Sequence, residues 1–143
     1  MDKAQENFGM LLGETARLWR TKLDQHLRPL GLSQAKWLVL LHLSLAKQDL
    51  TQKELSERLN IEGPSLVRLL DRMEQEGWVL RQASSLDRRA KTIHQTEKAA
   101  DMTREIKRIA KGVREQLLAG IDQRDLEVAS SILQQIKQRV ESL

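Results

Sequence analysis

The sequence predicts a mainly α-helical fold, a winged helix-turn-helix with a helical dimerisation lobe formed by the N- and C-terminal helices. Charged residues make up 31% of the chain and aromatic residues 3%, a composition that suits helices better than a β-sandwich. Apolar residues recur at steps of three and four over long stretches at both ends. Between these stretches, two short helices joined by a tight turn precede two strand candidates.

Length, charge and cysteine content restrict the class of protein. A chain of 143 residues predicts one compact unit, and a formal net charge of +4 favours nucleic acid or an anionic surface as partner. The absence of cysteine excludes disulfides, thiol catalysis and thiolate metal sites. The most apolar run, WLVLLHLSLA, is half of the about 20 residues that a membrane span needs, and the N-terminus lacks the pattern of a secretory signal. We therefore expect a cytoplasmic protein without a membrane partner.

No pattern in the chain predicts an enzyme, a cofactor or a metal site. His26, His42 and His94 fall in three separate predicted elements, without the spacing of metal ligands. The chain also has no glycine-rich phosphate loop and no nucleophile motif. The expected activity is therefore binding.

Two helices are predicted before the helix-turn-helix. In the first, from Gln5, an apolar stripe is spaced at three and four residues: Leu12, Ala16, Trp19, Leu23 and Leu27. This helix should end at Arg28, because Pro29 disfavours helical geometry in the residue before it. Ser33 is a candidate N-cap for the second helix, which is apolar enough to be central.

The stretch TQKELSERLN predicts the first helix of the helix-turn-helix, because Thr51 and Glu54 have the spacing of a capping box. Only three residues separate Asn60 from Pro64, which is well placed in the first turn of the next helix. That second helix, PSLVRLLDRMEQEG, is closed by Gly77. The strand candidates that follow, on either side of a polar loop, form the predicted wing.

Two further helices are predicted after the wing. Thr96 and Asp122 are their candidate N-caps, and both helices carry apolar residues at helical spacing: Met102, Ile106, Ile109, Val113 and Leu117, then Leu126, Leu133, Ile136, Val140 and Leu143. Together with the first helix they carry more apolar surface than a small helix-turn-helix core can cover. We therefore expect them to form a dimer interface.

The second helix of the helix-turn-helix has one apolar face and one polar face. Leu66, Leu70 and Met73 form the apolar face, and we place the following residues on or near the opposite face: Pro64, Ser65, Arg68, Leu69 and Arg72. An arginine on such a helix can donate two hydrogen bonds to guanine in the major groove. An arginine pair four residues apart is also what an ordinary solvated helix face carries, so both interpretations stay open.

The predicted wing places Arg88 and Arg89 at its tip. An arginine inserted into a narrow minor groove is attracted by the negative potential there. Asp87 would pair with the Arg89 guanidinium and hold it before binding. The alternative is a solvated ion pair of little energetic consequence.

The run PSLVRLLDRMEQEGWVLRQASSLDRRAKTIHQTEKA resembles the recognition helix and wing of MarR-family transcription regulators, most closely of the SlyA-like branch. The stretch from Leu18 to Trp37 is similar to that branch as well. The resemblance implies a homodimer that binds an inverted-repeat operator in double-stranded DNA. It also implies a single unit with dimerisation helices at 1–32 and 96–143 and a DNA-binding lobe at 33–95. Gln95 departs from the family pattern, which often has an apolar residue there.

The resemblance assigns roles to individual residues. Ser65 and Arg68 match major-groove positions, and Arg89 matches a minor-groove arginine held by Asp87. Arg17 and Trp37 match positions near a crevice where SlyA-like proteins bind small aromatic acids. A tryptophan on the apolar face of a central helix is also ordinary core. A helical module that binds another protein instead of DNA is the competing function.

Overall fold

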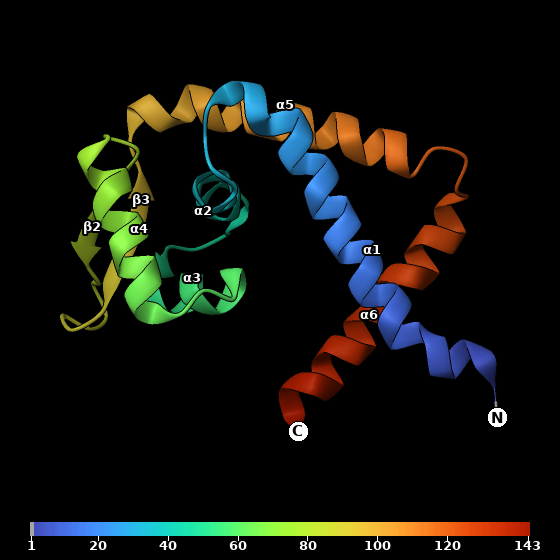
Figure 1. The fold of residues 1–143 in the computed structure, drawn as a ribbon. Coiled ribbons are helices and arrows are strands. Elements are labelled where there is room, and N and C mark those ends of the chain that lie inside the picture. Colours follow the sequence, from blue (N-terminus) through green and yellow to red (C-terminus); the bar gives the residue numbers. More distant parts are fainter. Residues whose placement is uncertain (1) are drawn as a thin grey trace. The chain divides into compact units, whose positions relative to one another are not determined.

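The computed structural model describes residues 2–143 and divides the chain into two units, one ending at Val113 and one spanning Arg114–Leu143. The predicted fold class is confirmed, since most of the chain is helical and the strands form one small sheet. In chain order (Figure 1) the elements are α1 (Lys3–Leu27), the 3₁₀ turn η1 (Arg28–Leu30), α2 (Gln34–Leu45), β1 (Leu50–Thr51), α3 (Gln52–Leu59), α4 (Gly63–Gln75), β2 (Val79–Ala83), β3 (Lys91–Gln95), α5 (Glu97–Leu117) and α6 (Gln123–Ser142). None of the helices in this part of the chain is long and apolar enough to cross a membrane.

The predicted N-caps are confirmed by hydrogen bonds at the helix starts. The Ser33 hydroxyl accepts from the Lys36 amide, and Asp122 accepts from the Arg124 amide. Thr51 and Glu54 form the complete capping box, in which each side chain accepts from the backbone amide of the other residue. These short polar side chains satisfy backbone donors that have no partner inside the helix.

The first helix ends one residue earlier than predicted, at Leu27. Pro29 is accommodated in the first turn of η1, because a backbone amide at that position would have no hydrogen-bond partner within the helix. The reversal comes at Gly31, whose φ of 77° is a left-handed conformation that glycine adopts at little cost.

The wing is an antiparallel hairpin in which β2 and β3 pair from Val79↔Gln95 to Ala83↔Lys91. The connecting loop is longer than a two-residue turn, as the sequence predicted. β1 was not predicted, because two residues are too short to show an alternating pattern. It pairs with β3, so the strand order is β1-β3-β2 and β3 is central.

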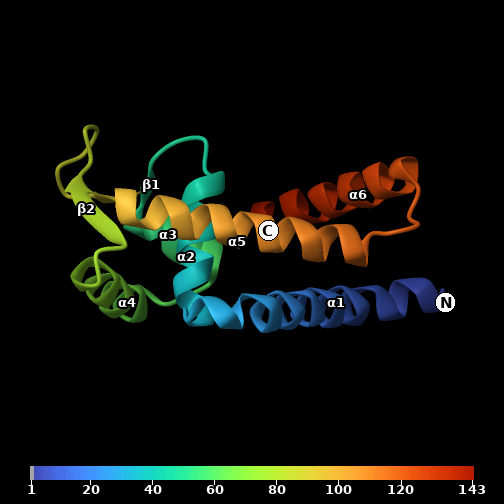
Figure 2. The ribbon, with the colours of Figure 1, turned by 90° about the horizontal axis from the view of Figure 1, so that it is seen from above.

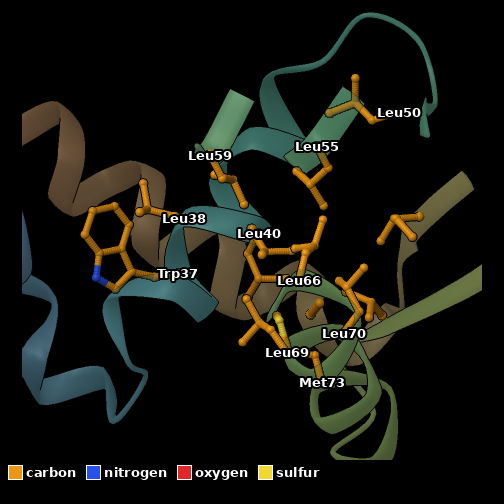
Figure 3. Packing of buried hydrophobic residues seen from close by; sticks show 14 of the residues in the cluster. Trp37, Leu38, Leu40, Leu50, Leu55, Leu59, Leu66, Leu69, Leu70 and Met73 are labelled. Carbon is orange, nitrogen blue, oxygen red and sulfur yellow. The ribbon is translucent and has the colours of Figure 1, made fainter. Parts of the chain in front are cut away.

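Helices α2 to α4 and the sheet enclose one hydrophobic core (Figure 3). From α4 the core takes Leu66, Leu69, Leu70 and Met73, all buried. The placement of Leu69 on the polar face was wrong, since its side chain is only 5% exposed. Leu66, Leu69, Leu70 and Met73 follow the spacing i, i+3, i+4 and i+7 of a full apolar stripe, which is wider than the three-residue face predicted.

The long helices bury different amounts of their apolar stripes. Ile106 and Val113 of α5 are already buried within the first unit, so the expectation that the α5 stripe needs a partner is only partly correct. Ile106 belongs to the same hydrophobic core as the buried residues of α2 to α4, and this core covers the first half of α5. By contrast, large apolar side chains stay exposed on α1 and α6: Phe8, Met10, Leu11, Leu12, Leu18, Val128, Ile132, Leu133 and Val140.

Candidate nucleic-acid interface

The outer face of α4 presents the residues that the sequence singled out. Pro64, Ser65, Arg68 and Arg72 are all exposed. The Arg68 guanidinium donates to the Ser65 hydroxyl over 3.3 Å, so these two side chains lie together on one side of the helix. The backbone there is oriented by the buried stripe on the opposite face of α4. The helix therefore offers two cations and one hydroxyl on a face that the core holds in place.

The turn before α4 is tight and internally bonded. Asn60 adopts a left-handed conformation with φ of 52°, which asparagine tolerates better than most residues. The Ile61 amide donates to the Ser56 carbonyl, and the Ser56 hydroxyl donates to the Ile61 carbonyl. These bonds fix the angle at which the chain leaves α3 and enters α4.

The other end of α4 is held by two lysines from neighbouring helices. Lys36 of α2 forms an ion pair with Glu76 at 2.7 Å. Lys98 of α5 donates to the Glu76 carbonyl over 2.6 Å, and its ammonium lies 4.3 Å from the centre of the Trp78 ring. Cations near a helix C-terminus are stabilised by its partial negative charge. Both ends of α4 are therefore attached to the lobe.

The wing loop, residues 84–90, is organised by its own hydrogen bonds. The Ser84 amide donates to the Ala90 carbonyl, and the Ala90 amide donates to the Asp87 carbonyl. The Leu86 amide donates to the Ser84 hydroxyl. The Asp87 carboxylate accepts from the Arg89 backbone amide over 3.0 Å. The prediction that Asp87 pairs with the Arg89 guanidinium is therefore wrong for this structure, because the carboxylate closes the turn by capping the backbone instead.

The tip of this loop projects beyond the helices of the first unit (Figure 2). Arg88 and Arg89 are exposed there, and Leu86 is 96% exposed. The two guanidiniums put positive charge at the tip of the loop, where an anionic partner can reach it.

Sequence reasoning missed Arg81, which joins the wing to α4. Its guanidinium donates through Nε to Glu74 over 2.7 Å and through Nη2 to Asp71 over 2.5 Å. The hydrogen bond to Glu74 is the main cause of a raised pKa for Arg81. The signal was present in the sequence as two carboxylates three residues apart on α4, but only the hairpin register shows that Arg81 reaches them.

Gln95, the residue that departs from the family pattern, lies at the end of β3. Its side-chain amide donates to the Leu40 carbonyl of α2 over 2.6 Å, and its carbonyl oxygen accepts from the Thr103 hydroxyl of α5. The end of the wing is therefore joined to α2 and α5 by polar contacts, where an apolar residue would offer none.

The structure places Arg17 and Trp37 in different environments. Trp37 is 1% exposed, and its indole N–H donates to Asp24 of α1 over 3.0 Å. Arg17 is exposed on α1, and no hydrogen bond or ring contact joins it to Trp37 in the described structure. Nearby on α2, the pKa of His42 is lowered by burial and by the charges of Arg58 and Arg20. Two guanidiniums, from α3 and α1, therefore act on the same side chain.

Within residues 2–143, no group of three or more His, Asp or Glu side chains is placed to hold a metal ion. The candidate site therefore consists of exposed cations on the outer face of α4 and at the tip of the hairpin, and one small core holds α4 and the hairpin together.

Comparison with known proteins identifies transcription regulators with this fold. The MarR family model matches residues 30–90. The structure of transcriptional regulator PA3341 has 46% sequence identity and a TM-score of 0.90, covering 95% of this chain and 99% of that one. A MarR transcriptional regulator from Methanosarcina mazei Go1 has 24% identity and a TM-score of 0.77, covering 96% and 99%. CouR from Rhodococcus jostii RHA1, solved with p-coumaroyl-CoA bound, has 20% identity and a TM-score of 0.77, covering 95% of each chain.

The similarity to the last two structures shows a shared fold, while the sequence identity to PA3341 over nearly the whole chain shows homology. The chain belongs to the MarR family, whose members are non-enzymatic transcription regulators. Its helix-turn-helix and hairpin are the winged helix of that family.

Proposed function

We propose that this protein is a cytoplasmic, sequence-specific regulator of the SlyA-like branch, which binds an inverted-repeat operator as a homodimer. Residues 33–95 form its DNA-binding lobe, and residues 1–32 and 96–143 supply its dimerisation helices. The observation that carries the proposal is the presence of exposed arginines at two sites of one lobe, Arg68 on α4 and Arg89 at the wing tip. A recognition helix in the major groove and a wing in the minor groove need this pair of sites.

The exposed α4 residues that the sequence singled out each have a role in this proposal. Arg68 donates to a guanine edge in the major groove, where its bond to Ser65 already orients the guanidinium. Ser65 contacts a base or phosphate near the helix start, next to Pro64, which lies in the first turn and has no backbone donor. Arg72, one turn further along, contacts a phosphate.

In the wing, Arg89 enters the minor groove and Arg88 contacts the phosphate backbone. Asp87 holds the turn through the Arg89 amide, so the arginine side chain leaves a backbone that is already ordered. Ordering before binding lowers the entropy lost on complex formation. Asp87→Ala should therefore weaken binding in the same direction as Arg89→Ala, but less.

The minor-groove assignment is tested with three duplexes that share one operator, first recovered by selection from random DNA. Their flanks differ: A·T, I·C or G·C. An I·C pair keeps the major-groove edge of G·C but lacks the minor-groove amino group of guanine. The wild type should bind A·T and I·C flanks alike and G·C flanks more weakly, and Arg89→Ala should remove this difference. An I·C flank that behaves like G·C contradicts the assignment.

Salt dependence separates DNA binding from the competing function, a module that binds another protein. Neutralisation of phosphates by arginines makes affinity fall steeply as salt rises. Two salt concentrations on random duplex DNA suffice for this test. Affinity that is weak and nearly independent of salt would favour the protein-binding module.

The proposed dimer is supported by the apolar side chains that α1 and α6 leave in water. Replacing both Ile136 and Val140 with Asp should give a monomer in light scattering. Ser131→Asp with Gln138→Asp adds the same two charges to other exposed positions of α6 and should leave a dimer. A dimer that survives the first pair of changes contradicts the assignment of the lobe.

We also propose that a small aromatic carboxylate modulates operator binding near Arg17 and Trp37. The support is the cationic surroundings of His42, five residues after Trp37, together with exposed Arg17. Since Trp37 is buried against Asp24, an acid reaches it only if α1 shifts relative to α2. Salicylate should weaken operator binding by the wild type and much less by Arg17→Ala. Unchanged affinity at saturating salicylate removes that compound as an effector.

A further inference from the structure

One ion-pair network links the hairpin to α4. The Arg81 guanidinium, at the middle of β2, binds two carboxylates of α4 with two different nitrogens, Nε to Glu74 and Nη2 to Asp71. Among the described side chains, no other hydrogen bond or ion pair joins residues 79–95 to α4. The guanidinium is planar and rigid, so two such bonds fix its direction as well as its distance from the helix.

The location of this link matters for the proposed DNA contacts. Arg81 pairs across the hairpin with Ile93 of the central strand, and Asp71 is next to Arg72 and three residues after Arg68. The link therefore joins the middle of the wing to the part of α4 that carries the exposed arginines. At the base of the wing, Thr96 donates to the Gly77 carbonyl and Gln95 donates to the Leu40 carbonyl, both at the end of the hairpin opposite the loop.

A small tilt of the wing would change which base step its tip reaches. Five residues of strand span about 17 Å, so a tilt of about 10° moves the far end by about 3 Å. This displacement is comparable to the rise of about 3.4 Å per base pair. β1 pairs with β3 only at Ile93 and Thr92, so β1 does not hold the strand ends next to the loop. The direction of that outer part of the hairpin therefore depends on the further contacts of β2 and β3.

We propose that Arg81 is a positioning residue that fixes the register between the major-groove contacts of α4 and the minor-groove contact of the wing. The inference rests on the proposed function, since it needs a wing that reads the flank of the operator. It predicts that the spacing between the half-site and the preferred flank is read as strictly as the bases themselves. Loosening the link should relax that spacing without changing the bases that α4 selects.

The network is exposed enough to be removed without unfolding the lobe. The Arg81 side chain is 22% exposed and its two partners more so, and such surface ion pairs contribute little to the free energy of unfolding. Arg81→Met keeps most of the length of the side chain and removes the guanidinium. Asp71→Asn combined with Arg81→Met also removes the link but keeps the net charge of the network at its wild-type value. Arg81→Lys keeps the cation but lacks the planar, rigid guanidinium that fixes the direction of the two bonds.

The experiment compares these variants with the wild type on two operator duplexes, one with the A·T flank at its selected position and one with that flank moved outward by about one base pair, a rise of about 3.4 Å. The measured quantity is the ratio of the two affinities. The wild type should prefer the selected position by about tenfold, a free-energy difference typical of one good contact. Arg81→Met, alone or with Asp71→Asn, should lower the ratio at least threefold, and Arg81→Lys should give an intermediate ratio. Preference at the α4 bases and melting temperature should stay unchanged.

Three outcomes would overturn the inference. An unchanged ratio in the charge-matched double variant shows that the link does not set the register. A ratio that falls in Arg81→Met and recovers in the double variant shows that Arg81 only screens the carboxylates from DNA. If the wild type itself shows no flank preference on the A·T, I·C and G·C duplexes, the minor-groove contact fails and the register inference fails with it. That last result is separate from the first two, in which the wild type keeps its preference.

Discussion

The recognition helix α4 and the wing loop both present arginines to solvent, but the two regions are held in different ways. Behind Arg68 lie four buried residues of the core and a neighbouring helix at each end. Behind Arg89 lie a few hydrogen bonds within the loop, of which one comes from Asp87. The helix is therefore positioned by packing, and the wing loop by local hydrogen bonds. The strands behind the loop are joined to β1 and, through Arg81, to α4.

This difference matches the chemistry that each region is proposed to carry out. Base edges in the major groove are distinguished by hydrogen bonds whose geometry tolerates little displacement, which favours a cation on a packed helix. The minor groove is read mainly through its width and potential, which an arginine on a bonded but exposed loop can follow. A core substitution should therefore disturb the helix much more than any single substitution disturbs the loop.

The largest expected effect comes from a substitution in the core that packs against α4. Leu70 is completely buried, so Leu70→Ala should lower the free energy of unfolding by about 2 to 5 kcal/mol. Leu86→Ala, at the exposed wing tip, should change it by less than about 0.5 kcal/mol. Urea unfolding followed by circular dichroism, at one protein concentration, measures both. Equal losses would mean that the loop is packed in solution, contrary to the comparison.

The next effect concerns binding. Arg68→Ala should cost about 1 to 3 kcal/mol on the best operator and less on a random duplex. Arg88→Ala should weaken binding to both DNAs similarly. It should also reduce the slope of log affinity against log salt concentration by about one unit for each phosphate that the side chain no longer neutralises. Fluorescence anisotropy at several salt concentrations gives both quantities. If Arg68→Ala weakens binding to the two DNAs equally, Arg68 is a phosphate contact, and α4 and the wing loop contact DNA in the same way.

A smaller effect compares the caps of the two regions. Thr51 begins α3, which packs against α4, with a complete capping box, so Thr51→Ala should cost about 1 kcal/mol of unfolding free energy. Asp87→Ala removes an exposed bond to the Arg89 amide and should cost less than about 0.5 kcal/mol, although it weakens binding. Thermal unfolding in parallel with operator titration separates the two effects. A loss of unfolding free energy from Asp87→Ala as large as that from Thr51→Ala would contradict this ranking.

The smallest effect is a pH dependence that belongs to the helical part alone. Burial, Arg58 and Arg20 lower the pKa of His42 below 6.5, so the unfolded chain binds its proton more readily than the folded one. Its contribution to stability is therefore complete above pH 6.5 and is lost as the pH falls through the folded pKa. Between about pH 7.5 and about pH 5.5, the melting temperature of the wild type should fall more than that of His42→Gln. Identical losses would show that other groups determine the acid sensitivity.

Much of the fold could be predicted because its signals are local. Ser33, Thr51 and Asp122 cap the helices that follow them, and Pro64 lies in the first turn of α4, since each acts on backbone groups within a few residues. The exposed positions of Arg68 and Arg72 followed from the helical period. The hairpin with its long polar loop followed from two strand candidates without a two-residue turn signal.

What failed in the prediction depended on contacts that no local pattern encodes. Leu69 is buried because the core reaches further around α4 than three apolar positions indicated. β1 exists only because β3 lies beside it. Asp87 could bind either the guanidinium or the backbone amide of Arg89, and only the folded turn decides between two partners in the same residue.

By itself the sequence determined the order of the helices, the family, and the exposed arginines that are proposed to contact DNA, because caps, periodicity and motifs act between residues close together in the chain. Only the tertiary structure decided that Arg81 reaches Asp71 and Glu74, and that Gln95 joins the Leu40 carbonyl from 55 residues away. A hydrogen bond forms only within about 3 Å of separation, and distances across the chain become that short only once the core has placed one element against another.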